Sequence, residues 1–156
     1  MVCGQANSKL KQNESNKLMS DPLIFVSIKC QVGQIFDSKY KSSAYEAMKK
    51  EIGVIMAKNS STFTMDKAKG DAPVQFEWTV TLNVTRDDKS TPPKLVAKVK
   101  WDGFKFTSGR SAKITAEGGA NYEGLHPNKL DKDAAEATTA AVESVMLKKV
   151  IPAMTP

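Results

Sequence analysis

A run of twelve residues alternates between apolar and polar side chains, and this pattern limits the folds open to the chain. Six apolar side chains occupy every second position from residue 74 to residue 84: Val74, Phe76, Trp78, Val80, Leu82 and Val84. Strict period two predicts a β-strand with one face in the core and the other in water. Such a strand needs neighbouring strands and a layer over its apolar face, so the sequence predicts a sheet with one buried face.

A second apolar run and an amphipathic pattern precede this strand. Residues 23–32 are rich in β-branched and aromatic side chains, which predicts a first strand. Ser43 and Glu46 fit a capping box at the start of a helix that should end near residues 58–59. Gly53 weakens this helix, and we interpret it as a point of close packing on the sheet. The apolar residues of the helix share one face: Tyr45, Met48, Ile52, Ile55 and Met56.

A hairpin is predicted after the alternating strand. Residues 95–101 alternate again and lead into Asp102-Gly103, a dipeptide typical of two-residue hairpin loops. We therefore expect Trp101 and Phe104 to pair across the hairpin, with Phe106 on the same apolar face. The returning strand should extend to about residue 116.

An alanine-rich helix is expected over residues 132–150. Asp131 or Asp133 can cap its first turn, and Glu136 completes a capping box with Asp133. The small side chains would let this helix lie close to a sheet, and Pro152 should help to end it.

These elements follow the order β-α-β-β-β-α, with a further short strand near residues 62–65 as an option. The order indicates an α+β fold, in which two helices pack on one face of a twisted, mainly antiparallel sheet. We assign residues 22–156 to a single domain and the polar residues 1–21 to a flexible N-terminal tail. The oligomeric state stays open, although the strand at 74–85 would favour dimers if it lay at a sheet edge.

The residue counts argue against several catalytic chemistries. The chain has one histidine, His126, and two cysteines, Cys3 and Cys30. A zinc site needs about four such ligands, and nucleophilic catalysis of the Ser-His-Asp or Cys-His kind needs a well-placed imidazole. His126 precedes Pro127 in a turn-like segment and is interpreted as a solvated residue. The sequence therefore predicts no catalytic residue, no metal and no cofactor, and it does not favour an enzyme.

Positive charge is concentrated in one stretch of the chain. Residues 94–113 hold six basic side chains and one acidic side chain, in a chain whose net charge is +6. We expect four lysines to form a basic sheet face: Lys98, Lys100, Lys105 and Lys113. In the predicted hairpin Lys100 lies opposite Lys105, and like charges in that position are destabilising.

This basic face suggests a non-enzymatic binding or structural module for an acidic partner, either a protein or a nucleic acid. The alternative is an ordinary solvated face on which Glu77 lies between the lysines. Stacking on nucleic-acid bases is not expected, because the predicted register turns Phe104 and Phe106 to the opposite face.

Two other functions stay open. Cys3 followed by a polar linker is similar to the mature start of a bacterial lipoprotein, so Cys3 is a candidate for lipid attachment if a leader has been trimmed. The protein would then be a cell-envelope lipoprotein or a secreted accessory protein; the sequence leaves the compartment open between the cytoplasm and the cell envelope. The second alternative is a small apolar-ligand carrier or enzyme with a pocket lined by Trp78, Trp101 and Met48. No apolar run approaches the ~20 residues of a membrane-spanning helix.

Overall fold

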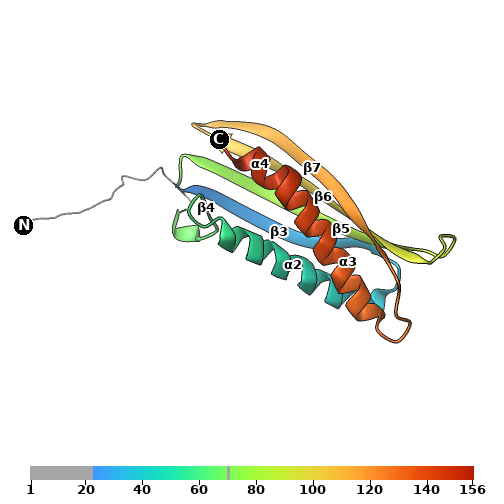
Figure 1. Cartoon of the computed structure of the whole chain (residues 1–156). Coiled ribbons are helices and arrows are strands. Elements are labelled where there is room, and N and C mark those ends of the chain that lie inside the picture. Colours follow the sequence, from blue (N-terminus) through green and yellow to red (C-terminus); the bar gives the residue numbers. More distant parts are fainter. Residues whose placement is uncertain (1–22, 70) are drawn as a thin grey trace, which may run out of the picture.

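The computed structural model describes residues 23–69 and 71–156 (Figure 1). Cys3 and the segment assigned to a flexible tail, residues 1–21, lie outside this range. Five strands form one open sheet in the order β4-β3-β5-β6-β7. Their bounds are β3 (Ile24–Ile35), β4 (Phe63–Thr64), β5 (Val74–Asp87), β6 (Lys94–Thr107) and β7 (Arg110–Glu123).

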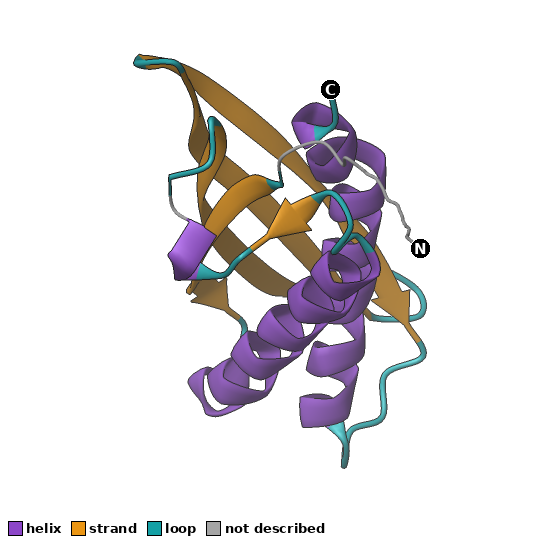
Figure 2. Cartoon of the chain, turned by 90° about the vertical axis from the view of Figure 1, so that its left-hand side faces the viewer, coloured by secondary structure: helices purple, strands orange, loops and turns teal. Residues whose placement is uncertain are grey.

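The helices lie together on one face of this sheet (Figure 2). They are α2 (Lys41–Lys58) and α3 (Leu130–Val145), and α3 continues through a π-helical turn (Met146–Val150) into α4 (Ile151–Met154). Strand β3 runs parallel to β4 and β5, whereas β5, β6 and β7 are antiparallel. The connection from β3 to β5 passes through α2, because parallel neighbours need a crossover. The predicted α+β fold and element order are confirmed, as is the short strand near residues 62–65.

The core lies between the sheet and the two helices. All the even-numbered apolar residues of β5 from Phe76 to Val84 are buried, as the alternating sequence predicts. Trp78 and Trp101 meet edge to face with ring centroids 5.5 Å apart. Helix α3 lies close to β7 at Gly118, where a Cβ atom would stand 2.9 Å from Val145 Cγ2. Strand β5 has β3 on one side and β6 on the other, so it is not a sheet edge.

The predicted hairpin at Asp102-Gly103 is wrong, because β6 continues through both residues. Asp102 pairs with Thr79 of β5 and with Thr115 of β7. The turn lies instead at Ser108-Gly109, where φ is 44° and 79°. Two positive φ angles in a two-residue loop are the requirement of a type I′ turn. Gly103 has another role, since a Cβ atom there would stand 2.0 Å from the carbonyl oxygen of Glu77.

The continuous strand reverses the predicted orientation of residues 104–107, which lie between Gly103 and the turn. Phe104 and Phe106 point away from the helices, and each pairs with a polar residue on both neighbouring strands. Lys105 turns to the helix side, where its Nζ lies 5.8 Å from the centroid of the Phe76 ring. Lys100 and Lys105 are therefore not opposite each other, and the expected repulsion between them does not arise.

The helix ends also differ from the predictions. Helix α2 begins at Lys41, directly after the short 3-10 turn Ser38–Tyr40, so Ser43 and Glu46 lie inside the helix and form no capping box. Helix α3 begins at Leu130, with neither predicted aspartate as its N-cap. Pro152 does not end the helix, because helical structure continues to Met154. A proline ring clashes with the carbonyl four residues earlier, and the π-helical turn before Pro152 widens the helix at that point.

Gly53 is not a point of close packing. A Cβ atom at this position would meet no heavy atom within 4 Å. The side chain of residue 53 would therefore point into open space beside α2.

Candidate functional site

The sheet face opposite α2 and α3, here called the open face, is covered by no other element in the described part of the chain (Figure 1). Strand alternation places three of the four predicted lysines on it. Lys98 pairs with Asn83 and Gly119, whereas Lys100 pairs with Thr81 and Glu117. Lys113 of β7 lies opposite Phe104. Lys105 belongs to the other face.

Carboxylates interrupt the lysines of the open face. Glu77 pairs with Phe104, and Asp102 lies two residues from Lys100 along β6. Glu117 lies directly across from Lys100. The open face therefore carries mixed charge, with lysines that can neutralise an anionic group and acids that lower the local potential.

Two exposed phenylalanines lie among these charged residues. Phe104 is 44% exposed and Phe106 is 36% exposed, and their ring centroids are 6.2 Å apart. Both rings stand on the open face, because alternate residues of a strand share one face. Sequence reasoning missed this aromatic pair, since a turn placed at Asp102-Gly103 assigns the wrong face to the residues between that point and the true turn at Ser108-Gly109.

A hollow of about 550 Å³ lies along β6 and β7. Lys98, Lys100 and Glu117 contribute to its lining. Gly119 forms part of its floor, and a Cβ atom there would stand 2.3 Å from the carbonyl oxygen of Ala97. The missing side chain thus allows close strand packing and leaves space on the surface.

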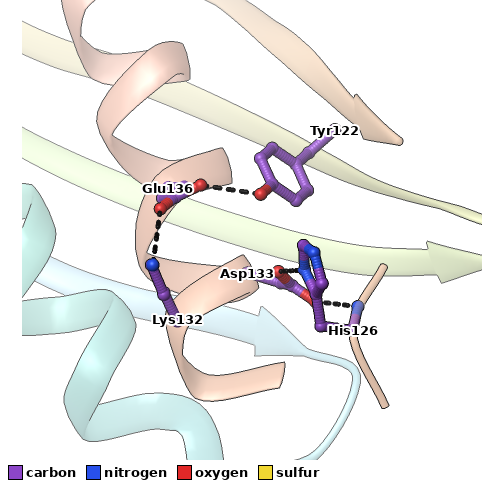
Figure 3. Close-up of polar contacts among 5 residues, drawn as sticks. All are labelled: Tyr122, His126, Lys132, Asp133 and Glu136. Atoms are coloured by element: carbon purple, nitrogen blue, oxygen red, sulfur yellow. Dashed lines mark hydrogen bonds and ion pairs between the residues drawn. The ribbon is translucent and has the colours of Figure 1, made fainter. Parts of the chain in front are cut away.

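A separate polar cluster joins the end of β7 to the start of α3 (Figure 3). Asp133 is 1% exposed, and its carboxylate accepts two hydrogen bonds from His126. The backbone N–H of His126 donates to Oδ2 at 2.6 Å, and the ring Nδ1 lies 2.9 Å from Oδ1. The His126 side chain is 62% exposed, which agrees with the predicted solvated turn, but its bond to a buried aspartate was not predicted.

Tyr122 and Glu136 form the other half of this cluster. The Tyr122 hydroxyl donates to Glu136 Oε1 at 2.6 Å, and Lys132 Nζ lies 4.0 Å from the other carboxylate oxygen. The hydrogen bond to Glu136 raises the pKa of Tyr122 to about 12, and desolvation and nearby carboxylates add to the shift. Glu136 therefore bonds to β7 rather than completing a capping box with Asp133.

The cluster acts as a structural link. A histidine bonded to a buried aspartate is an arrangement used in general base catalysis, but catalysis also requires a reacting group in reach. In the described residues the ring of His126 bonds to Asp133, and its backbone carbonyl accepts from the N–H of Lys129; no hydroxyl or thiol is bonded to the ring. No group of three His, Cys, Asp or Glu side chains is placed to hold a metal ion in this part of the chain. The cluster fixes the loop after β7 to α3.

The residues of the carrier hypothesis lie in the core. Met48 and Trp101 are fully buried, and Trp78 donates from Nε1 to Met154 Sδ at 3.3 Å. A hollow between α2 and β3 lies elsewhere, at the sheet edge, and is lined by other side chains.

Comparisons with known proteins give no family for the chain. No family model matches it, and no curated protein matches it in sequence. Among solved structures, the hypothetical protein CT253 from Chlamydia trachomatis aligns with a TM-score of 0.47 and 8% sequence identity. That alignment covers 86% of this chain and 96% of the other. Within the described residues, no helix has the length and apolar character needed to cross a membrane.

Proposed function

We propose that the chain is a non-enzymatic binding module whose open face binds an acidic partner, and that single-stranded nucleic acid is the partner whose chemistry fits this face best. One observation carries the proposal: the exposed rings of Phe104 and Phe106 lie on the same face as Lys98, Lys100 and Lys113. Proteins that bind single strands combine aromatic platforms for bases with positive charge for phosphates.

The geometry suits an unpaired strand rather than a duplex. Phe104 and Phe106 occupy successive outward positions of β6, on the order of 7 Å apart along the strand. Splayed bases can stack on such rings, whereas bases inside a duplex expose only their edges. The carboxylates of Glu77, Asp102 and Glu117 oppose phosphate binding, so we expect moderate affinity and a strong dependence on salt.

The proposal is tested by fluorescence polarisation with a labelled twelve-nucleotide oligouridine over a salt series. We expect binding at low salt. The logarithm of the association constant should fall linearly with the logarithm of the salt concentration, with a slope set by the number of phosphates contacted. The variant K98Q/K100Q/K113Q should reduce that slope. The variant F104A/F106A should weaken binding by roughly 1–3 kcal/mol per stacked base while leaving the slope nearly unchanged.

Lys105→Gln is the matched control, because Lys105 lies on the other face of the same strand. It should leave binding unchanged. Absence of binding at low salt, or an equal loss in K105Q and in the triple lysine variant, would contradict the proposal for nucleic acid. A loss that follows only the lysines, with no effect of F104A/F106A, would favour an acidic protein as the partner.

A further inference from the structure

The outer edge of β3 is largely without a neighbouring strand. Strand β4 pairs only with Ile24 and Phe25, whereas β3 continues to Ile35. The other side of β3 is paired with β5 over most of its length. Beyond the N–H of Val26, which belongs to the pairing with β4, the outer edge therefore has no strand partner among the described residues.

The direction of one hydrogen bond identifies the free backbone groups. The N–H of Ile24 donates to the carbonyl oxygen of Thr62, on the outer side of β3. Backbone groups of alternate residues point to the same edge of a strand. The N–H and C=O groups of Ile28, Cys30 and Val32 therefore point outward, and no partner for them occurs in residues 23–69 or 71–156. Val26 shares this direction, but its N–H is used by the parallel pairing of Phe25 with Thr64.

A hollow of about 440 Å³ lies beside this edge, between β3 and α2. The side chains of Ile28, Cys30, Ile52 and Met65 give it an apolar lining. Gly53 also lines it and leaves it open, since a Cβ atom there would touch nothing within 4 Å. The glycine that weakens α2 thus widens the hollow.

The charged residues that line the hollow are both basic. Lys29 lies on β3, and Lys49 lies on α2 with its Nζ 5.1 Å from the centroid of the Tyr45 ring. No carboxylate belongs to the lining. The site is therefore complementary to an acidic segment that also carries apolar side chains.

The opposite edge of the sheet offers a weaker site. There the side chain of Lys149 donates to the backbone carbonyl of Glu117 on β7. Strand β7 also carries exposed charged residues such as Arg110 and Lys113, and charges on an edge strand hinder pairing with another chain.

We propose that an extended peptide with alternating apolar and acidic side chains binds as an added strand along Ile28–Val32 of β3. Its backbone bonds to the free groups of Ile28, Cys30 and Val32, as in other cases of strand addition. Its apolar side chains enter the hollow beside Gly53, and its acidic side chains, which point to the other face of the sheet, lie beside Lys29. This site is separate from the open face, and the proposal does not depend on the proposed function.

The test uses the full chain labelled with ¹⁵N and an eight-residue peptide of alternating valine and aspartate. We expect the peptide to slow amide hydrogen exchange at Ile28, Cys30 and Val32 at least tenfold. The amides of Ser27, Lys29 and Gln31 should change little, because they already point toward β5. A valine-lysine peptide of the same length should not bind.

Substitutions at Gly53 separate binding from folding. Gly53→Leu should fill the hollow and weaken peptide binding at least tenfold without lowering Tm, because the position is open and leucine favours a helix. Gly53→Ala is the matched control and should retain most of the binding. Lys29→Glu should also weaken binding, because Lys29 shares the face of the acidic side chains. The variant K98Q/K100Q/K113Q should bind the peptide normally, which keeps this result distinct from a failure of the open-face proposal.

Several outcomes would overturn the inference. Equal binding to G53L and the native chain would exclude the hollow, and equal binding of the lysine peptide would exclude the charge argument. Slow exchange at Ile28, Cys30 and Val32 without peptide would show that the chain itself covers the edge. Protection that grows with protein concentration alone would identify a second copy as the occupant.

Discussion

Asp133 shows how one buried side chain can fix a loop. Its carboxylate is almost fully buried and accepts both the backbone N–H and the ring nitrogen of His126. Burial of a carboxylate is unfavourable unless hydrogen bonds replace water, and both oxygens of Asp133 are bonded. The sequence showed Asp133 only as a candidate cap, because the seven-residue separation from His126 follows no standard capping pattern.

We expect Asp133→Ala to lower the free energy of unfolding by about 1–3 kcal/mol, the usual penalty for leaving buried partners unsatisfied. Urea denaturation gives this value. His126→Ala is the matched control and should have a smaller effect, because its backbone N–H can still donate to Asp133. Equal losses in the two variants would show that the ring, and not the backbone bond, holds the loop.

The hydroxyl of Tyr122 gives a prediction about high pH. The neutral phenol donates to Glu136, and ionisation would remove the donor and place two negative charges together. Its pKa is raised from 10.0 to about 12, so this contribution to stability is complete below pH 10 and is lost as the pH rises through about 12. Ultraviolet titration should show one tyrosine that ionises late. Glu136→Gln should return that tyrosine toward pH 10, and an unchanged titration curve would contradict the assignment.

At the scale of elements, hydrophobic periodicity predicted which segments form strands and helices. The alternation in residues 74–85 and the helical spacing from Tyr45 to Met56 are local patterns, set by residues close together in the sequence. The structure contains the strand and the helix that these patterns predict. The failure at Asp102-Gly103 has a different origin. The sequence alone does not distinguish a glycine needed for a close approach of two strands from a glycine needed for a turn.

Substitution of Gly103 distinguishes these two roles. A methyl group at this position would overlap the carbonyl oxygen of Glu77, so Gly103→Ala should lower stability by roughly 1–3 kcal/mol through overpacking. Gly109→Ala should cost about 1 kcal/mol, because φ is 79° there and the space around it is open. Thermal denaturation compares the two. A neutral G103A would mean that β6 does not run through Gly103 as described.

At the scale of the whole molecule, the sheet has two open edges and one uncovered face among the residues that the structure describes. The lysines of the open face could be predicted in part, since Lys98, Lys100 and Lys113 share a face whether or not the chain turns at Gly103. Lys105, Phe104 and Phe106 could not, because their orientation depends on the position of a single turn. The hollow between β3 and α2 could not be predicted either, since it depends on how far β4 extends along β3.

The central position of β5 predicts a gradient of hydrogen exchange across the sheet. Its amides bond on both sides, to β3 or to β6, and should exchange only when the molecule unfolds globally. Alternate amides of β7 point away from β6 and should exchange faster, apart from any that a partner protects. Native-state exchange followed by NMR measures both sets. Uniformly slow exchange along β7 would indicate that a second molecule covers that edge.

The π-helical turn between α3 and α4 bears on how the chain tolerates changes in length. A π turn holds one residue more than an α turn, and Leu147 within it is 53% exposed. Deletion of Leu147 could convert the segment to a regular α-helix while Val150 and Met154 keep their places in the core. Homologous chains with a regular helix here should therefore be one residue shorter between Val145 and Ile151. Their alignment with this sequence needs a gap inside a helix, a position where gaps are ordinarily penalised.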